Sequence, residues 1–512
     1  MVAGAATRAR AERLDQLTFS RFLVVLLVLA AHGVGGIYRA AIDVFPVSSV
    51  FNFAPSAVSY LFVLSGFVMS LVYHQPGTRF RVRDFWTSRF VRIYPLYLIA
   101  FLLVCLYYLE YMAHISAVKI LANLFIVQAW IPSFAQSFNY PAWSLTAEVL
   151  FYALFPFLTA WSYRQPLRKL VWASLGFWAV SQTVHYVLWS RYWPAAESLL
   201  VYQPVFHLSS CLLGAVGGAW YVREGQKLRS APRTTLAVLT MGLVMASICM
   251  FMGDLFPWFP RWLQPMQGLF APFFLVTILA MALDRSRLSR WLSQPLPVLL
   301  GETSYALYIL HVPVVWLLER GLHEASLPRP GHIQAAAALP LMLVVGLVAH
   351  QYVDLPLRRW LKRMMERVDL LIAVVDIGVI AASVTLAFVL RFGIGRQLAE
   401  FELAANLMFW LAVVVRTAVA AAFSVNGQAH VTGAYKRTVP RLVGAISVGT
   451  IVIATLMWAA FRMGWAPGFP RGVLLMDWVF TLLLVLASRF ALRKRDAPDD
   501  RQGPAVDGRT PA

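Results

Sequence analysis

The chain has 512 residues, of which 60% are hydrophobic and only 13% are charged, and its net charge is +20. A soluble globular protein carries about 25% charged and about 45–50% apolar residues, so this composition excludes a water-soluble enzyme and an unstructured chain. The basic residues lie in short loops between apolar runs, each about 20 residues long. That pattern is typical of the cytoplasmic loops of a multi-pass membrane protein rather than of nucleic-acid binding.

Ten membrane spans are predicted in the first part of the chain from its apolar runs. They lie near 17–37, 47–73, 90–110, 143–163, 171–189, 203–221, 234–252, 266–283, 297–317 and 333–353. The short apolar piece 120–131 is predicted to be a re-entrant or interfacial part of an outer loop, 111–142. With this assignment, 23 basic residues fall on one side of the membrane and 6 on the other, which predicts cytoplasmic ends for the ten-helix bundle.

A second group of four apolar runs follows near 369–390, 404–424, 442–461 and 472–490. The predicted fold is therefore an all-α polytopic membrane protein with ten helices plus four additional transmembrane helices. The polar tail 496–512 is predicted to be disordered. The three cysteines, Cys105, Cys211 and Cys249, all lie in apolar runs and have neither disulfide-framework nor metal-site spacing, so no metal site is expected.

Two ionisable residues interrupt the first apolar run, Arg21 and His32. Eleven steps of about 100° return them to nearly the same helix face, about 16 Å apart along the axis. An ionisable group inside a span is costly unless it is paired or faces a cavity. On this helix alone, a functional polar stripe and a snorkelling arginine with a satisfied packing histidine explain the pattern equally well.

Two further clusters lie where predicted spans meet the membrane surface. Arg89 and Arg92 share a helix face at the cytoplasmic mouth, where a pair can clamp phosphates, although ordinary positive-inside flanking charge explains them too. Glu148 stands one turn inside the outer end of the fourth span and needs a partner or a role. The alternative for Glu148 is an interfacial position beside Trp143 in an aromatic belt.

The ninth span carries three polar residues on one face, because Ser304, Tyr308 and His311 are spaced i, i+4 and i+7. This spacing indicates either the lining of a cavity or hydrogen bonds between packed helices.

Taken in chain order, these residues resemble the motifs of the acyltransferase-3 family of integral-membrane acyltransferases. The similar strings are Leu14–Thr18 with Arg21-x10-His32, Phe62–Phe67 with Ser65, Arg89-x-x-Arg92 with Pro95, Trp143-Ser-Leu with Glu148, Phe151 and Tyr152, and Ser304-Tyr305 through Tyr308 to His311. Asp354-Leu-Pro356 stands where the family usually has Glu-x-Pro. The resemblance covers residues 1–365 and predicts one membrane domain there.

The resemblance implies transfer of an acyl group, commonly acetyl, from cytoplasmic acyl-CoA to a hydroxyl of a surface glycan or lipid-linked saccharide. Acyl-CoA is then a co-substrate, and no bound cofactor is implied. By resemblance the catalytic residues are His32, Arg21 and Glu148, the acyl-CoA-binding residues are Arg89, Arg92, Ser65 and Tyr94, and the acceptor or cavity-lining residues are Trp143, Ser304, Tyr305, Tyr308 and His311. Direct transfer and a relay through a covalent acyl-enzyme on Ser65 or Ser304 both remain open.

The segment 368–495 resembles the four-helix membrane anchor of polysaccharide-biosynthesis nucleotide-sugar dehydratases and epimerases. The similar strings are Val368–Gly393, Gly433–Lys436 and Phe469–Trp478. No strand–GxGxxG–helix unit follows Arg495, so no nucleotide-sugar chemistry is expected. A module of this kind would dock the protein to polysaccharide-assembly proteins in the bacterial inner membrane or would associate with itself, and a degenerate anchor explains it equally well.

Other classes of function compete with the enzyme. A proton-coupled transporter or flippase also carries intramembrane Arg, His and Glu, but no internal repeat or matching pair of broken helices is evident. A second acyltransferase class uses a His-x4-Asp signature, and here His350 precedes Asp354 by one residue too few. A structural assembly protein without chemistry is the third alternative, against which the intact His32 and arginine pair argue.

Overall fold

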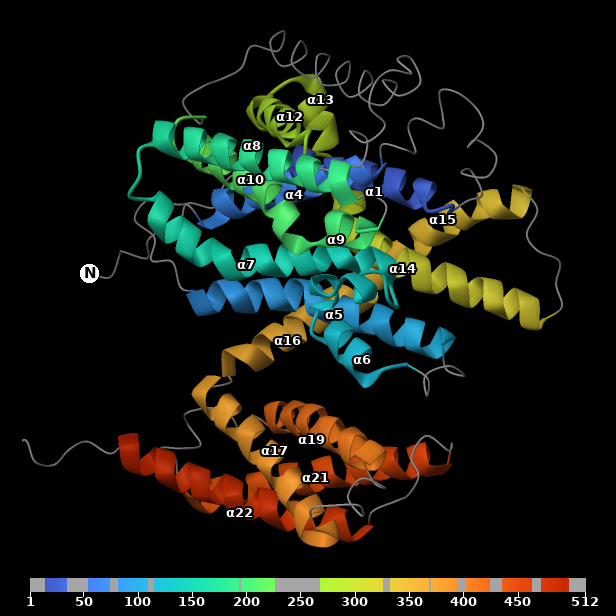
Figure 1. Ribbon diagram of the computed structural model, residues 1–512, viewed down its shortest axis with the longest axis vertical. Helices are drawn as coiled ribbons and strands as arrows, with labels where there is room; N and C mark the ends of the chain where they lie inside the picture. The colour runs from blue at the N-terminus through green and yellow to red at the C-terminus, as the bar shows by residue number, and fades with distance from the viewer. Residues whose placement is uncertain are drawn as a thin grey trace, which may run out of the picture. The chain divides into compact units, whose positions relative to one another are not determined.

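The computed structural model describes residues 14–34, 54–73, 82–108, 115–192, 195–225, 268–325, 332–367, 370–393, 402–423, 435–462 and 471–496. These residues are almost entirely helical and include no β-strand, which confirms the predicted all-α class. Nine helices in this described part are long and apolar enough to cross a membrane. The chain divides into two compact units, residues 1–358 and 359–512 (Figure 1).

Long helices at the predicted spans build the first unit. They are α1 (Asp15–Ala31), α4 (Ala54–Tyr73), α5 (Val82–Tyr107), α7 (Trp143–Ser162), α8 (Leu167–Tyr192), α10 (Pro204–Arg223), α12 (Ala271–Leu283), α14 (Pro295–Glu324) and α15 (His332–Val348). Neither α1, with 17 residues, nor α8, with Gln182 and His185 buried in its course, is among the nine long apolar helices. The predicted span near 234–252 lies outside the described residues.

The apolar piece 120–131 does not form a spanning helix, in agreement with its prediction as part of a loop. Helix α6 (Ala117–Leu124) has eight residues, and three 3-10 turns follow it: η2 (Gln128–Trp130), η3 (Pro132–Phe134) and η4 (Tyr140–Ala142). Gln128 Nε2 donates to the carbonyl of Ala142 at 3.1 Å, and Asn139 Nδ2 donates to that of Ile309 at 2.8 Å. These buried amides supply the hydrogen bonds that irregular backbone needs when water is excluded.

Helices α1 and α14 run side by side in the same direction, because Thr18 meets Gly301 at one end and His32 meets His311 at the other. A Cβ atom on Gly301 would overlap the backbone of Thr18 and Phe19. Only glycine permits so close an approach. The polar residues that follow Gly301 on α14 are therefore brought against the face of α1 that carries Arg21.

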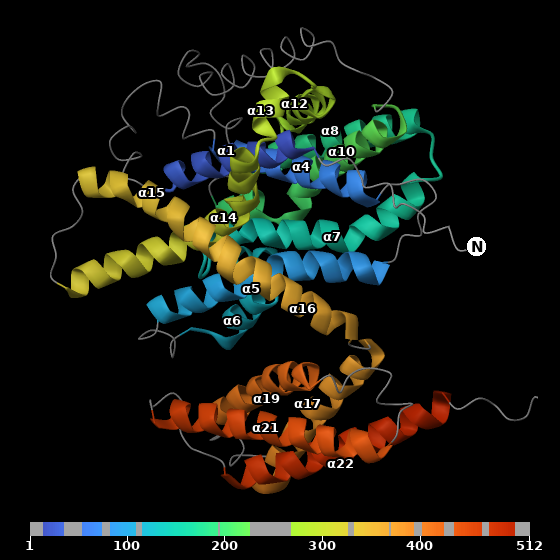
Figure 2. The same ribbon diagram turned by 180° about the vertical axis from the view of Figure 1, so that it is seen from behind.

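Helix α15 continues without a break through the π-helical turn η7 (Ala349–Asp354) into α16 (Leu355–Arg367) (Figure 2). A π-turn pairs each residue with the fifth along the chain and so accommodates one extra residue per turn. The predicted tenth span thus extends into the basic stretch that follows it. The boundary between the two compact units falls within α16.

The second unit consists of four helices that correspond to the four predicted apolar runs. They are α17 (Leu370–Phe392), α19 (Glu402–Ala422), α21 (Tyr435–Arg462) and α22 (Arg471–Asp496). Their core includes Val384, Phe388, Met408 and Met457.

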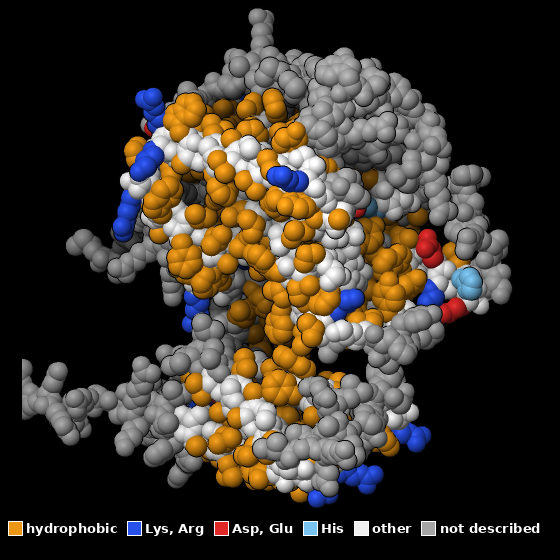
Figure 3. Space-filling view, viewed as in Figure 1, with side chains coloured by type: hydrophobic (Ala, Val, Ile, Leu, Met, Phe, Trp, Pro, Cys, Tyr) orange, Lys and Arg blue, Asp and Glu red, His pale blue; other side chains and the backbone are white. Residues whose placement is uncertain are grey.

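Apolar side chains also occur on the outside of both units, among them Phe157, Trp172 and Leu475. Figure 3 shows hydrophobic side chains over most of the described surface of one face. Helices that are apolar all round are expected where the surroundings are lipid.

Candidate active site

Two adjoining cavities lie among α1, α4, α5, α7, α14 and η7. The larger has a volume of about 790 Å³, and its polar lining residues are Thr18, Arg21, Arg92, Glu302, Ser304, Tyr305, His350 and Arg358. The smaller has a volume of about 110 Å³, and its polar lining residues are Arg21, Ser65, Arg89, Arg92, Ser144, Glu148, Tyr152, Ser304, Tyr305 and Tyr308. Four of these residues line both cavities, so the two form one continuous polar site.

Guanidinium groups outnumber carboxylates in this site. Arg21, Arg89 and Arg358 all lie close enough to Arg92 for their charges to act on it. Within the described residues, neither Arg21 nor Arg92 makes a hydrogen bond or an ion pair to another side chain. Cations in excess of carboxylates in a low-dielectric interior favour an anionic ligand.

Arg89 sits among aromatic rings at the edge of the smaller cavity. Its guanidinium carbon lies 5.6 Å from the ring centroid of Tyr73 and 5.9 Å from those of Phe85 and Tyr152. Its Nη2 donates to Tyr73 Oη at 3.4 Å. Cation–π contacts of this kind hold a guanidinium group in place without neutralising its charge.

Glu148 belongs to the arginine-lined cavity and not to an aromatic belt. Arg92, Arg21 and Arg89 are near enough to act electrostatically on its carboxylate, and Tyr152 Oη donates to its Oε2 at 3.1 Å. Trp143, the proposed belt partner, is buried and packs on His207, with ring centroids 5.0 Å apart. The carboxylate thus balances part of the positive charge of the cavity.

The imidazole of the first helix is paired with a second one. His32 Nδ1 lies 2.9 Å from His311 Nε2, and the two rings stack with centroids 5.2 Å apart. His311 Nδ1 in turn lies 2.8 Å from the backbone carbonyl of Tyr308. Helical spacing could not predict the contact between His32 and His311, because the two residues are 279 positions apart in the sequence.

This chain of contacts determines which nitrogen carries each proton. A carbonyl oxygen only accepts, so His311 Nδ1 must donate to Tyr308, and the neutral ring then has an acceptor at Nε2. His32 Nδ1 must therefore donate to His311 Nε2. The remaining nitrogen of His32, Nε2, is left as an acceptor on an exposed side chain.

The end of α1 positions His32. Val34 N donates to the carbonyl of Leu29 at 3.1 Å, and Gly33 N donates to that of Ala30 at 3.0 Å. Gly33 has φ of 82°, a left-handed conformation that glycine adopts readily. These features define a Schellman motif, in which His32 is the last residue before the chain turns away.

Not every predicted site residue lines the cavities. His32 and His311 do not, but Tyr308, one turn before His311, lines the smaller cavity and lies 2.9 Å from Ser144 Oγ. The histidine pair therefore adjoins the cavity at its end away from Arg358. Tyr94 stacks on Phe90 with centroids 4.7 Å apart and lines neither cavity, as is also true of Trp143.

Sequence reasoning missed three site residues, His350, Asp354 and Arg358. His350 was compared only with a His-x4-Asp signature, Asp354 was also matched to the family's Glu-x-Pro, and Arg358 was counted only among the basic residues of the cytoplasmic side. The available signal was their separation by four residues each, which places them along one helix face.

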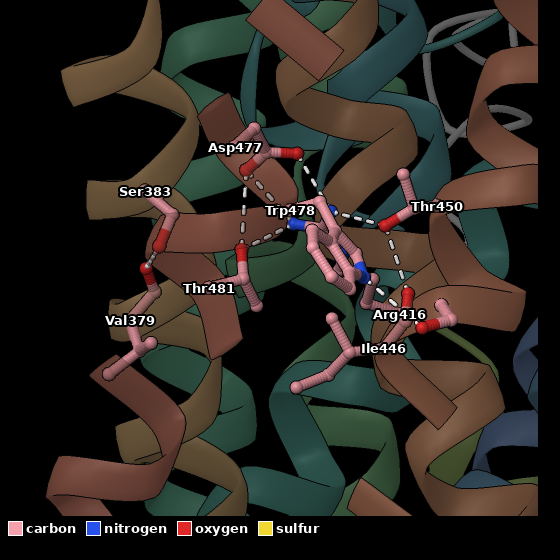
Figure 4. A network of polar contacts seen from close by, with 9 residues as sticks. Val379, Ser383, Arg416, Ile446, Thr450, Asp477, Trp478 and Thr481 are labelled. Carbon is pink, nitrogen blue, oxygen red and sulfur yellow. Dashed lines mark hydrogen bonds and ion pairs between the residues drawn. The ribbon is translucent and has the colours of Figure 1, made fainter. Parts of the chain in front are cut away.

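The second unit contains buried charges of a different kind (Figure 4). Arg416 Nη1 donates to Asp477 Oδ1 at 2.9 Å and to Thr481 Oγ1 at 2.6 Å, and Arg416 Nη2 donates to Thr450 Oγ1 at 2.8 Å. Arg489 Nη2 contacts Asp376 Oδ2 at 2.6 Å. Each of these arginines has its own aspartate.

The fold and the site define a multi-pass membrane protein with a histidine pair next to an arginine-lined cavity. A family model described as an acyltransferase domain matches residues 14–351, two thirds of the sequence and most of the first unit. The chain belongs to the acyltransferase-3 family. The second unit lies outside this match.

Two curated relatives agree with this assignment. "Acyltransferase MdmB" of Streptomyces mycarofaciens is 30% identical over 372 residues, which cover 69% of this chain and 94% of the relative. "Peptidoglycan O-acetyltransferase OatA" of Listeria monocytogenes is 24% identical over 330 residues, which cover 59% of this chain and 51% of the relative. No solved structure matches the chain significantly.

Proposed function

We propose that this membrane acyltransferase moves an acyl group, acetyl in the simplest case, from cytoplasmic acyl-CoA to a hydroxyl of a surface glycan or lipid-linked saccharide. The observation that carries the proposal is the series of hydrogen bonds from Tyr308 through His311 to His32, which leaves Nε2 of the exposed His32 side chain as an acceptor. An imidazole held in this tautomer is what a general base needs in order to take a proton from a hydroxyl group.

The arginine-lined cavity supports acyl-CoA as the donor. Arg21, Arg92 and Arg89 have guanidinium groups that can bind phosphate oxygens through paired N–H donors. Helical geometry separates Arg21 from His32 by about 16 Å along α1. The long pantetheine arm of coenzyme A suits this separation, because phosphates held by the arginines leave the thioester near the histidine pair.

The transfer step follows from the tautomer. His32 Nε2 takes the proton of the acceptor hydroxyl while its oxygen attacks the thioester carbonyl. The tetrahedral intermediate collapses with cleavage of the carbon–sulfur bond, and the thiolate leaves with the proton that His32 returns. His311 Nε2 continues to accept from His32 Nδ1 and so stabilises the transient imidazolium, as the orienting partner of a catalytic histidine does.

The acceptor class rests on the relatives and on the outer part of the site. One relative is named a peptidoglycan O-acetyltransferase, which supports an acetyl group and a glycan hydroxyl. Ser304, Tyr305 and Tyr308 place hydroxyl groups along the cavity wall that leads toward the histidine pair. Hydroxyl-bearing side chains of this kind suit a carbohydrate, which both donates and accepts hydrogen bonds.

Location and the role of the second unit belong to the same proposal. The asymmetry of basic residues supports a bacterial inner-membrane protein with both ends in the cytoplasm. The similarity of 368–495 to a polysaccharide-biosynthesis membrane anchor supports a unit that docks the enzyme to assembly proteins or to a second copy. Deletion of 368–512 with retention of transfer activity would assign it an accessory role.

Labelled acetyl-CoA tests the proposal in membranes that contain the full chain. The wild type should transfer label to glycan, and His32→Ala should not. His323→Ala, which removes an exposed imidazole at the far end of α14, is the matched control and should behave as the wild type. Equal labelling by the wild type and His32→Ala would remove His32 from the chemistry, and substrate uptake without transfer would favour a transporter.

A further inference from the structure

A third imidazole lies at the other end of the cavity. His350 is in the π-helical turn η7 and is only 3% exposed. Its Nδ1 lies 3.2 Å from Asp354 Oδ2, and Asp354 also accepts from Arg358 Nε at 2.7 Å and Nη2 at 2.6 Å. Because the carboxylate can only accept, the hydrogen on Nδ1 points to Asp354, and the opposite edge of the ring presents Nε2.

That opposite nitrogen is buried and has no hydrogen-bond partner among the described residues. His350 nevertheless lines the larger cavity, together with Arg21, Arg92 and Arg358. A buried polar atom without a partner is costly and calls for an explanation. A ligand in the cavity is the explanation that also accounts for the neighbouring guanidinium groups.

The irregular helix is a second observation that points the same way. Residues 349–354 leave the α-helical pattern in the turn that carries both His350 and Asp354. Single π-turns within α-helices are frequent at functional sites. Here the turn places the imidazole of His350 at the cavity wall in contact with the carboxylate of Asp354, and Arg358 on the next turn lines the cavity and donates to Asp354.

We propose that His350 is a specificity-determining residue for the donor, whose Nε2–H binds a phosphate oxygen at the anionic end of acyl-CoA. This inference rests on the proposed function. The imidazolium form has N–H groups at both ring positions, so one donates to Asp354 and the other to the phosphate. Asp354 is a positioning residue, because it accepts from the ring and lines neither cavity, and Arg358 in turn donates to Asp354.

Two substitutions of the same residue separate a ligand contact from a structural one. In His350→Asn the short amide reaches the place of Nδ1, so the contact with Asp354 is kept and the Nε2 position is lost. In His350→Gln the longer amide reaches the place of Nε2, so the phosphate contact is kept. If His350 is purely structural, the Asn variant should retain more activity than the Gln variant. If His350 binds the ligand, the Gln variant should retain more activity than the Asn variant.

The measurement is kcat/KM of the full chain in membranes with two donors, acetyl-CoA and S-acetylpantetheine, which lacks the phosphates. His350→Asn should lower kcat/KM for acetyl-CoA about 10- to 100-fold, as expected for a lost hydrogen bond to a charged group. It should leave kcat/KM for S-acetylpantetheine unchanged. His350→Gln should recover most of the loss with acetyl-CoA.

Normal kinetics of His350→Asn with acetyl-CoA, or an equal loss with both donors, would overturn the inference. Equilibrium binding of coenzyme A and of pantetheine gives a readout that does not depend on transfer. A wild type that binds coenzyme A more tightly than His350→Asn does, yet transfers no acetyl group, would contradict the proposed function and support this site. Equal binding by the two proteins would contradict the site alone.

Discussion

The two units of the protein bury arginine in opposite ways. In the first unit, Arg21 and Arg92 line a cavity and make no ion pair among the described residues. In the second unit, Arg416 and Arg489 are 3% and 6% exposed, and each contacts an aspartate at 2.8 Å or less. Glu148 balances only part of the positive charge in the first arrangement, so an anionic ligand would complete it, whereas the charges of the second arrangement are already paired.

This comparison teaches how to separate binding residues from structural ones in a membrane bundle. Charge alone does not distinguish them, because both units place arginine among apolar helices. The distinction lies in whether the counter-charge is part of the chain. In the second unit the paired charges join α19 to α22 and α17 to α22, whereas in the first unit the excess of cations over carboxylates favours an anionic ligand.

The largest effect is expected from breaking a pair in the second unit. Asp477→Ala leaves Arg416 buried without its carboxylate and should lower the free energy of unfolding by about 3–5 kcal/mol. Thermal unfolding in detergent measures the change. The double variant Arg416→Met with Asp477→Leu should regain most of the stability, and Thr455→Ala, at an exposed position of α21, should lose little. If Asp477→Ala unfolds at the same temperature as the wild type, the ion pairs of the second unit are not structural, and the distinction between paired and unpaired arginines fails.

The converse experiment removes an unpaired charge from the cavity. Arg92→Gln should change thermal stability far less than Asp477→Ala does, because Arg92 has no ion pair or hydrogen bond to another described side chain to lose. The same variant should raise KM for acetyl-CoA about 10- to 100-fold through loss of a charged hydrogen bond. A loss of stability as large as that of Asp477→Ala would show that Arg92 is structural after all.

A similar loss of activity, of different origin, is expected at the histidine pair. His311→Leu removes the acceptor for His32 Nδ1, so the tautomer of His32 is no longer determined. We expect kcat to fall about 10- to 100-fold, within the range for a disturbed general base, while KM for acetyl-CoA stays constant. His311→Gln, whose amide oxygen reaches the place of Nε2, should recover part of kcat. A change confined to KM would argue for a binding role instead.

The smallest effect is expected at the end of α1. Gly33→Ala places a side chain at φ of 82° and should cost about 1 kcal/mol of stability. No neighbouring atom would contact the added Cβ, so the cost is conformational and not steric. Gly176→Ala, in the middle of α8 with equal open space, is the matched control and should be neutral or stabilising. A neutral Gly33→Ala would show that the Schellman motif is not what holds His32.

Much of the site follows from sequence because the membrane makes polar residues conspicuous. Arg21, Arg92 and Glu148 interrupt apolar runs, and all three line one cavity in the structure. Tyr94, which follows the arginine pair, and Trp143, which begins the Trp-Ser-Leu string, were predicted by resemblance, and both pack elsewhere. An ionisable group inside an apolar run marks a candidate site on physical grounds, whereas sequence proximity to such a group does not.

Composition, apolar run length and loop charge determined by themselves that this is an all-α multi-pass membrane protein, because lipid demands long apolar helices and internally satisfied backbone. They also identified the ionisable residues inside the predicted spans, which are costly there unless they are paired or face a cavity. Only the tertiary structure decided their partners. It paired His32 with His311, gathered four arginines around the two adjoining cavities and brought His350, in contact with Asp354, to the wall of the larger one. The reason is that helical periodicity specifies which residues share a face, whereas packing between distant helices specifies what that face meets.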